Sequence, residues 1–280
     1  QSAFTNCSEL TKIVIPSTVT EWKTVSYAYD PQIPAEKRPG FFDGVLGWDR
    51  GEETTIIFNG GLSNETKFMD DAYNEFQKME VDHLIINCDV DNKTELCAAP
   101  KMKKVTVKSG VTSPVYFPKF SGNQYLETVD IQSNITYLPN SRFASCKALK
   151  SVSFPETLTS LGDNCFYGCS NLLRITLPEN LTHISPYAFS RSGIAFITIP
   201  DKVHTIGTYA FSHCERLTEI NIPNSTTTIE KCAFYSCRNM REIYIPNSVK
   251  TIGVHAFEDV MHITYYGSAD GKPWDAQSMN

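Results

Sequence analysis

Cysteine and histidine are the residues of this chain with the most versatile chemistry, because both bind metals and both act in catalysis. Of the nine cysteines, Cys165 and Cys169 are separated by three residues, and Cys232 and Cys237 by four. No second cysteine or histidine pair follows at the distance that a zinc finger requires. The six histidines occupy unrelated positions. The sequence therefore predicts no metal site and no cofactor.

Catalytic motifs do not occur in the sequence either. It contains no His-Glu-x-x-His, no Gly-x-Ser-x-Gly, no phosphate-binding glycine loop and no paired-carboxylate signature. A catalytic site assembled from several distant segments would leave no such motif, so that alternative stays open. We expect a protein that is not an enzyme.

The overall composition restricts the classes of partner. The net charge is −6, and lysine and arginine form no cluster that would track a phosphate backbone, so we expect no nucleic-acid partner. No apolar run approaches the ~20 residues of a membrane span. The chain shows no signal peptide or anchor, and it begins only three residues before Phe4. We therefore expect a trimmed or processed start.

Phenylalanine recurs at nearly constant intervals, and this repeat includes many of the cysteines. The interval is 22 or 23 residues throughout Phe120 to Phe257. Cysteine follows the phenylalanine by three residues at Cys146, Cys169, Cys214 and Cys237. We expect these thiols to be buried as small apolar residues, with a disulfide or metal role as the alternative. Cys88 and Cys97 lie outside the repeat and are the better candidates for a disulfide.

Each repeat also contains an apolar-x-apolar-Pro segment, such as Ile220-Asn-Ile-Pro223. Alternating apolar residues form a strand with one buried face, and proline ends the strand because it has no N–H group. A second apolar pair follows and often ends in glycine, which we expect to allow a special turn conformation. The Ala-Phe pair predicts a short helical or 3₁₀ turn. Stacking of the repeats would place the phenylalanine rings in one column at the centre of the core.

A period in this range with one β segment per repeat is typical of a leucine-rich-repeat solenoid. We expect one domain, residues 1–280, with a concave parallel β-sheet of about eleven coils and the helical or 3₁₀ turns on its convex side. We divide it into a first coil (1–19), an insertion (20–53), irregular coils (54–119), regular 23-residue repeats (120–262) and a C-terminal cap (263–280). Residues 63–79 have the apolar spacing of a helix.

The repeat Ala-Phe-x-x-Cys-x-x-Leu-x-x-Ile-x-Ile-Pro-x-x-Val-x-x-Ile-Gly resembles the BspA-like leucine-rich repeat family. It occurs nearly twice in succession between Ala210 and Gly253. The chain departs from the general leucine-rich consensus in having Pro where Asn or Cys follows the strand. The resemblance implies a bacterial protein, secreted or at the cell surface, that contacts host proteins, other cells or glycans. We expect an extracellular, monomeric binding module for protein interaction or adhesion.

Two regions are candidates for ligand binding. The outward face of the sheet is mostly polar but carries Phe196 and Tyr244, and exposed aromatic side chains often anchor a partner. The insertion is rich in aromatic residues, and long loops often bind ligands; these residues are Trp22, Tyr27, Tyr29, Phe41 and Trp48.

Each region also has an alternative interpretation. The polar face can reflect only the preference of Thr and Ser for exposed strands. The insertion can be a lid over weak N-terminal coils. If neither region binds a ligand, the protein is a passive surface spacer.

Overall fold

Alternating apolar residues form the first strand of each coil. In the computed structural model, which describes residues 12–15, 55–59, 81–89 and 102–265, Ile220 of β12 is buried and its two strand neighbours are exposed. We call strands of this kind the long strands. They are β1 (Lys12–Ile15), β2 (Thr55–Phe58), β3 (His83–Ile86), β4 (Lys104–Val107), β5 (Thr128–Ile131), β7 (Ser151–Ser153), β10 (Phe196–Thr198), β12 (Glu219–Asn221), β14 (Glu242–Ile245) and β16 (His262–Tyr265).

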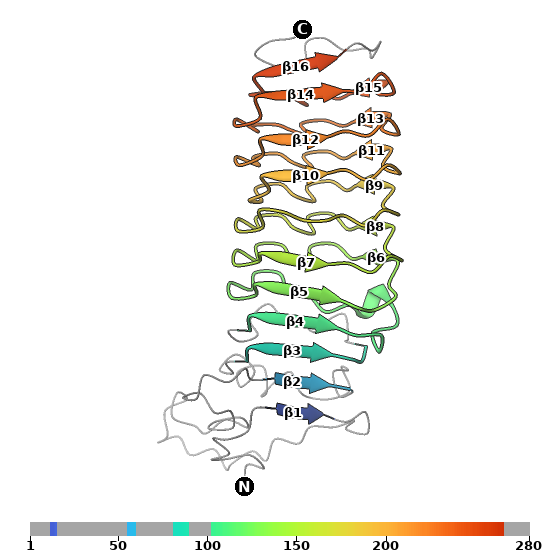
Figure 1. The fold of residues 1–280 in the computed structure, drawn as a ribbon, viewed down its shortest axis with the longest axis vertical. Helices are drawn as coiled ribbons and strands as arrows, with labels where there is room; N and C mark the ends of the chain where they lie inside the picture. The colour runs from blue at the N-terminus through green and yellow to red at the C-terminus, as the bar shows by residue number, and fades with distance from the viewer. Residues whose placement is uncertain (1–11, 16–54, 60–80, 90–101, 266–280) are drawn as a thin grey trace, which may run out of the picture.

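The long strands pair in parallel and in chain order, so each coil lies on the one before it (Figure 1). Strands β1, β2, β3, β4, β5 and β7 form one continuous sheet. The coil between β7 and β10 forms no long strand. Its only pairing on this side is an isolated parallel bridge from Arg174 to Phe196. Strand β10 then pairs with β12, and β14 with β16, whereas β12 and β14 lie in neighbouring coils without a ladder of hydrogen bonds between them. The parallel sheet predicted from the repeat is therefore present.

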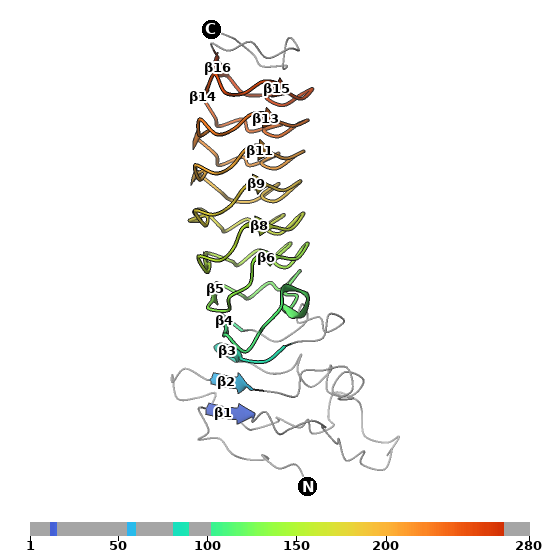
Figure 2. The same cartoon turned by 90° about the vertical axis from the view of Figure 1, so that its right-hand side faces the viewer.

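The second apolar pair of each repeat forms a short strand on another side of the coil (Figure 2). Here Ile206 and Ile229 are buried, and each is paired with its equivalent in the next coil. The short strands are β6 (Tyr137–Leu138), β8 (Ser160–Leu161), β9 (His183–Ile184), β11 (Thr205–Ile206), β13 (Thr228–Ile229) and β15 (Thr251–Ile252). Strands β9, β11, β13 and β15 form one parallel sheet, and β6 pairs with β8.

The described coils form a parallel β-solenoid that runs nearly straight in both views (Figures 1 and 2). The concave curvature expected of the sheet is not evident in either view. The count of about eleven coils and the division of the chain into segments stay predictions, because much of the chain before residue 102 lies outside the described residues. The helix expected at 63–79 and the cap after Tyr265 lie outside them as well.

A column of phenylalanine rings forms the centre of the core, as the spacing predicts. Phe211 is fully buried, and its ring stacks on those of Phe189 and Phe234 with centroid distances of 5.4 Å on both sides. Stacked rings continue from Phe120 to Phe257 at nearly constant distance. Each coil therefore covers the ring of its neighbour, and no coil has a closed core of its own.

The prediction of helical or 3₁₀ turns at these phenylalanines is wrong. We call the residues from two before to three after each repeated phenylalanine the phenylalanine turn. In the turn of Phe211, both Tyr209 and His213 have positive φ, at 55° and 56°. The left-handed conformation interrupts a right-handed helix. In the described part of the chain only Pro114–Tyr116 is helical, as one 3₁₀ turn.

Backbone bonds to the next coil take the place of the helix in the phenylalanine turns. The N–H groups of Tyr209, Phe211 and His213 donate to carbonyl oxygens of the next coil, at N–O distances of 3.0, 2.8 and 2.7 Å. The same pattern recurs in the turn of Phe166. These N–H groups are thus satisfied between coils and not within a helical turn.

The expected role of the repeated glycines also needs correction. Gly207 and Gly253 follow the short strands, where we expected a special turn conformation, but neither has a positive φ. Their position is explained by close packing of neighbouring coils. A Cβ atom added to Gly253 would lie 2.3 Å from the backbone nitrogen of Lys231. Glycine therefore allows two backbones to approach closely.

Candidate binding surface

The outward side chains of the long strands form the candidate surface, which we call the long-strand face. Because the strands pair residue for residue, equivalent side chains form rows along the stack. Toward the N-terminal end one of these rows is polar, whereas the other begins with Val14, Ile57 and Ile85. His83 Nε2 lies 2.8 Å from Thr106 Oγ1, and Ser151 Oγ lies 3.4 Å from Thr128 Oγ1. This part of the face offers polar groups that already bind one another.

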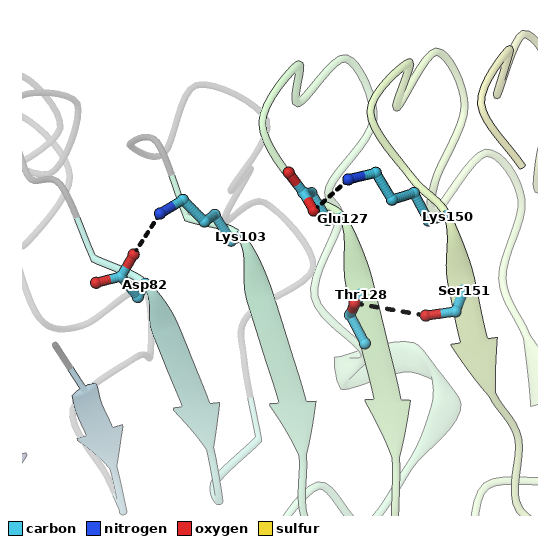
Figure 3. Close-up of polar contacts among 6 residues, drawn as sticks. All are labelled: Asp82, Lys103, Glu127, Thr128, Lys150 and Ser151. Carbon is cyan, nitrogen blue, oxygen red and sulfur yellow. Dashed lines mark hydrogen bonds and ion pairs between the residues drawn. The ribbon is translucent and has the colours of Figure 1, made fainter. Parts of the chain in front are cut away.

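Ion pairs join neighbouring coils at the start of the same strands (Figure 3). The Lys103 ammonium lies 2.8 Å from the Asp82 carboxylate, and that of Lys150 lies 2.6 Å from Glu127. In each pair the lysine comes one coil after the carboxylate. Charges of opposite sign therefore compensate each other within this part of the face.

Toward the C-terminal end the long-strand face changes character. The side chains of Phe196 and Tyr244 remain 46% and 57% exposed. Leu173, which lies one coil before Phe196, is 44% exposed. The Arg174 guanidinium lies 5.3 Å from the centre of the Phe196 ring. The two aromatic residues predicted for this face are thus on its surface, two coils apart.

The aromatic residues of the insertion lie outside the described residues. These are Trp22, Tyr27, Tyr29, Phe41 and Trp48. Their role in binding stays a prediction.

A second group of aromatic side chains lies on the phenylalanine turns and was not predicted from the sequence. The Tyr187 and Tyr209 rings stack at 4.9 Å, and His213 meets the Tyr235 ring edge to face at 5.3 Å. Desolvation and the nearby Arg191 charge lower the pKa of His213. Tyr187 and Tyr209 each lie two residues before a repeated phenylalanine, and this shared spacing was the signal that could have identified them; His213 and Tyr235 share no such spacing.

The repeated cysteines are buried and act as hydrogen-bond donors. The thiols of Cys214 and Cys237 donate to backbone oxygens of the preceding coil, with S–O distances of 3.0 and 3.1 Å. Burial raises the pKa of Cys214 and of Cys165 to about 12. A thiol that keeps its proton is a poor nucleophile and a poor metal ligand. The disulfide proposed for Cys88 and Cys97 stays a prediction, since Cys97 lies outside the described residues.

Within the described ranges no three His, Cys, Asp or Glu side chains gather in a way that could hold a metal ion. In the same ranges no helix has the length and apolar character needed to cross a bilayer. The chemistry of the described surface is therefore that of exposed strands, aromatic rings and charges.

The repeat agrees with a known family model. The model of the BspA type leucine rich repeat region, in six copies, matches residues 1–33, 93–218 and 183–267. The chain belongs to the BspA-type leucine-rich repeat family. The match covers most of the chain and includes the strands that carry Phe196 and Tyr244. A comparison with curated proteins finds no match.

Several solved structures of leucine-rich repeat proteins are similar to this BspA-type chain. A leucine-rich cell surface protein from Faecalibacterium prausnitzii is 24% identical over 65% of this chain and 64% of its own, with a TM-score of 0.40. A leucine-rich repeat protein from Bacteroides ovatus is 20% identical over 99% and 76%, with a TM-score of 0.48. The pneumococcal vaccine antigen PcpA is 17% identical over 91% and 62%, with a TM-score of 0.43. The chain thus spans less than two thirds of the first and third of these proteins.

Proposed function

We propose that this protein is a non-catalytic binding module, secreted or at the cell surface, that recognises a protein ligand through its long-strand face. Membership in the BspA-type family supports the surface location and the role in protein interaction. The observation that carries the proposal is the pair of exposed rings, Phe196 and Tyr244, whose outward neighbours on the adjacent strands are mostly polar. Large exposed rings surrounded by polar groups are typical anchors of protein interfaces.

The insertion aromatics are a second contact region in this proposal. Long loops often contribute to binding. Substitution of Trp22 and Tyr27 by alanine therefore weakens ligand binding if the insertion takes part. If the insertion is only a lid, these substitutions lower stability and leave affinity per folded molecule unchanged.

The proposal is tested by screening the chain against a broad array of proteins and glycans. We expect at least one protein ligand, and we expect Phe196→Ala with Tyr244→Ala to weaken its binding while the melting temperature is kept. Tyr137→Ala is the matched control, because that exposed ring lies on a short strand, on another side of the coil. No binding anywhere on the array would favour the passive spacer, and equal losses in both variants would remove the long-strand face from the proposal.

A further inference from the structure

Two carboxylates lie between the exposed rings of the long-strand face. Phe196 on β10 is paired directly with Glu219 on β12. Glu242 and Tyr244 lie on the next long strand, β14, and both point outward. Neighbouring strands are about 4.8 Å apart. Strands β12 and β14 share no ladder of hydrogen bonds, but they contact each other in successive coils, so Glu219 and Glu242 occupy equivalent positions one coil apart, with Phe196 before Glu219 and Tyr244 two residues after Glu242.

Neither of these carboxylates is in an ion pair among the described residues. Glu242 accepts only a 3.3 Å hydrogen bond from the Thr264 hydroxyl. This differs from the N-terminal part of the face, where Glu127 is paired with Lys150 (Figure 3). Like charges on neighbouring strands repel each other, so the pair costs stability in the free protein.

No lysine or arginine forms an ion pair with either glutamate among the described residues, and the basic group next in the row is His262, the strand partner of Glu242. Arg241 occupies the position of its coil that Lys150 occupies earlier, but the preceding coil has Thr218 there in place of a glutamate. The Arg174 guanidinium lies over the Phe196 ring, with Phe196 between it and Glu219. A permanently charged cation of a partner would therefore compensate the two carboxylates.

The rings at this site also suit a cation. Arg174 lies over one face of the Phe196 ring, so the opposite face is directed along the sheet toward Glu219. Tyr244 stacks on no other ring in the described part of the chain, and more than half of its side chain is exposed. Aromatic faces attract guanidinium and ammonium groups, and more so when a carboxylate lies close by.

We propose that the surface formed by Phe196, Glu219, Glu242 and Tyr244, which we call the acidic-aromatic surface, binds an arginine side chain of the protein partner. This inference rests on the proposed function. Arginine fits better than lysine because its planar guanidinium stacks on a ring and donates to two carboxylates at once. The net charge of −6 favours approach of a positively charged segment. Arginine is also among the residues that contribute most at protein interfaces.

The test uses the isotope-labelled chain and a short peptide, acetyl-Gly-Ser-Arg-Ser-Gly-amide, followed by NMR chemical-shift changes. The comparison peptide carries citrulline, which keeps the shape of arginine and loses its charge. We expect shift changes confined to the acidic-aromatic surface, and binding of the citrulline peptide at least about tenfold weaker. A lysine peptide should lie between the two.

Matched variants separate a local site from general charge attraction. Glu219→Gln with Glu242→Gln should abolish the arginine-specific shifts. Glu156→Gln with Glu179→Gln removes the same charge from exposed positions elsewhere and should leave them in place. Equal losses in both variants, or no arginine-specific shifts at all, would overturn the inference.

Three further outcomes are distinguishable. Shifts at the same residues that grow with protein concentration alone would mean that a second copy of the chain occupies this surface, which also overturns the inference. An array ligand that needs Phe196 but not the two glutamates would contradict the arginine site and leave the proposed function intact. Binding of the arginine peptide without any array ligand would support the site and count against the proposed function.

Discussion

The thiol of Cys214 donates a hydrogen bond to the backbone carbonyl oxygen of Phe189, which belongs to the preceding phenylalanine turn, over 3.0 Å. Cys237 makes the equivalent bond to Phe211. Where Ser192 takes the place of cysteine in the repeat, its hydroxyl lies 3.5 Å from the Cys214 sulfur. The repeated cysteine is therefore explained by a small buried side chain that fills space and donates weakly.

Replacing Cys214 by serine should cost less stability than replacing it by alanine. Serine keeps a donor for the Phe189 oxygen, whereas alanine removes the hydrogen bond. We expect the two variants to differ by about 0.5–1.5 kcal/mol in the free energy of unfolding, as measured by urea denaturation. The reverse order would show that apolar burial of the sulfur matters more than its hydrogen bond.

The buried thiols should make the protein less stable in alkaline solution. Burial raises the pKa of Cys165 and Cys214 from about 9 in the unfolded chain to about 12 in the folded one. Below pH 9 both states keep the thiol protons, so the contribution is fully present. Between about pH 9 and 12 only the unfolded chain releases them, and stability falls as the pH rises.

The pH effect is measured as the change in urea midpoint between pH 8 and pH 10.5. Cys214→Ala should show a smaller change than the unmodified protein, because one buried thiol no longer takes part. Tyrosine ionisation is common to both proteins and cancels in the comparison. Identical pH dependence in the two proteins would be inconsistent with a raised Cys214 pKa.

Truncation of one stacked ring should destabilise the whole array. Phe211→Ala removes contacts with both Phe189 and Phe234 and leaves a cavity between coils. We expect a loss of about 3–5 kcal/mol in the free energy of unfolding. Tyr125→Ala, at a half-exposed ring outside the column, is the control and should cost little. Equal melting temperatures for Phe211→Ala and the unmodified protein would contradict the buried column.

The ion pair between Lys150 and Glu127 should contribute little to stability despite its short distance. Both side chains are exposed to a third or more, so water and salt screen the attraction. A double-mutant cycle with Lys150→Gln and Glu127→Gln should give a coupling energy of about 0.2–1 kcal/mol, which falls at high salt. A coupling well above that range would assign the pair a larger structural role.

The sequence predicted the long strands and the core column well, because both depend on side-chain patterns that recur in every coil. Ile220 and Phe211 are examples whose burial follows from spacing alone. It also identified the exposure of Phe196 and Tyr244, since alternation in a strand assigns each residue a side.

Features that depend on neighbouring coils were not predictable in the same way. The positive φ values at Tyr209 and His213 are stabilised by backbone bonds to the next coil, and side-chain type gives no sign of them. The close approach at Gly253 likewise involves the backbone of Lys231, more than twenty residues away. Ion pairs such as Lys103 with Asp82 require the register between strands, which only the structure supplies.

The most direct test of the stacked-coil account is amide hydrogen exchange with phenylalanine selectively labelled with ¹⁵N. The N–H groups of Phe143, Phe166, Phe189, Phe211 and Phe234 each donate to a carbonyl oxygen of the next coil, at 2.8 to 3.0 Å. The account predicts that these amides exchange together and far more slowly than those of an unfolded chain. Exchange of the Phe189 and Phe211 amides at the rate of an unstructured peptide would contradict it.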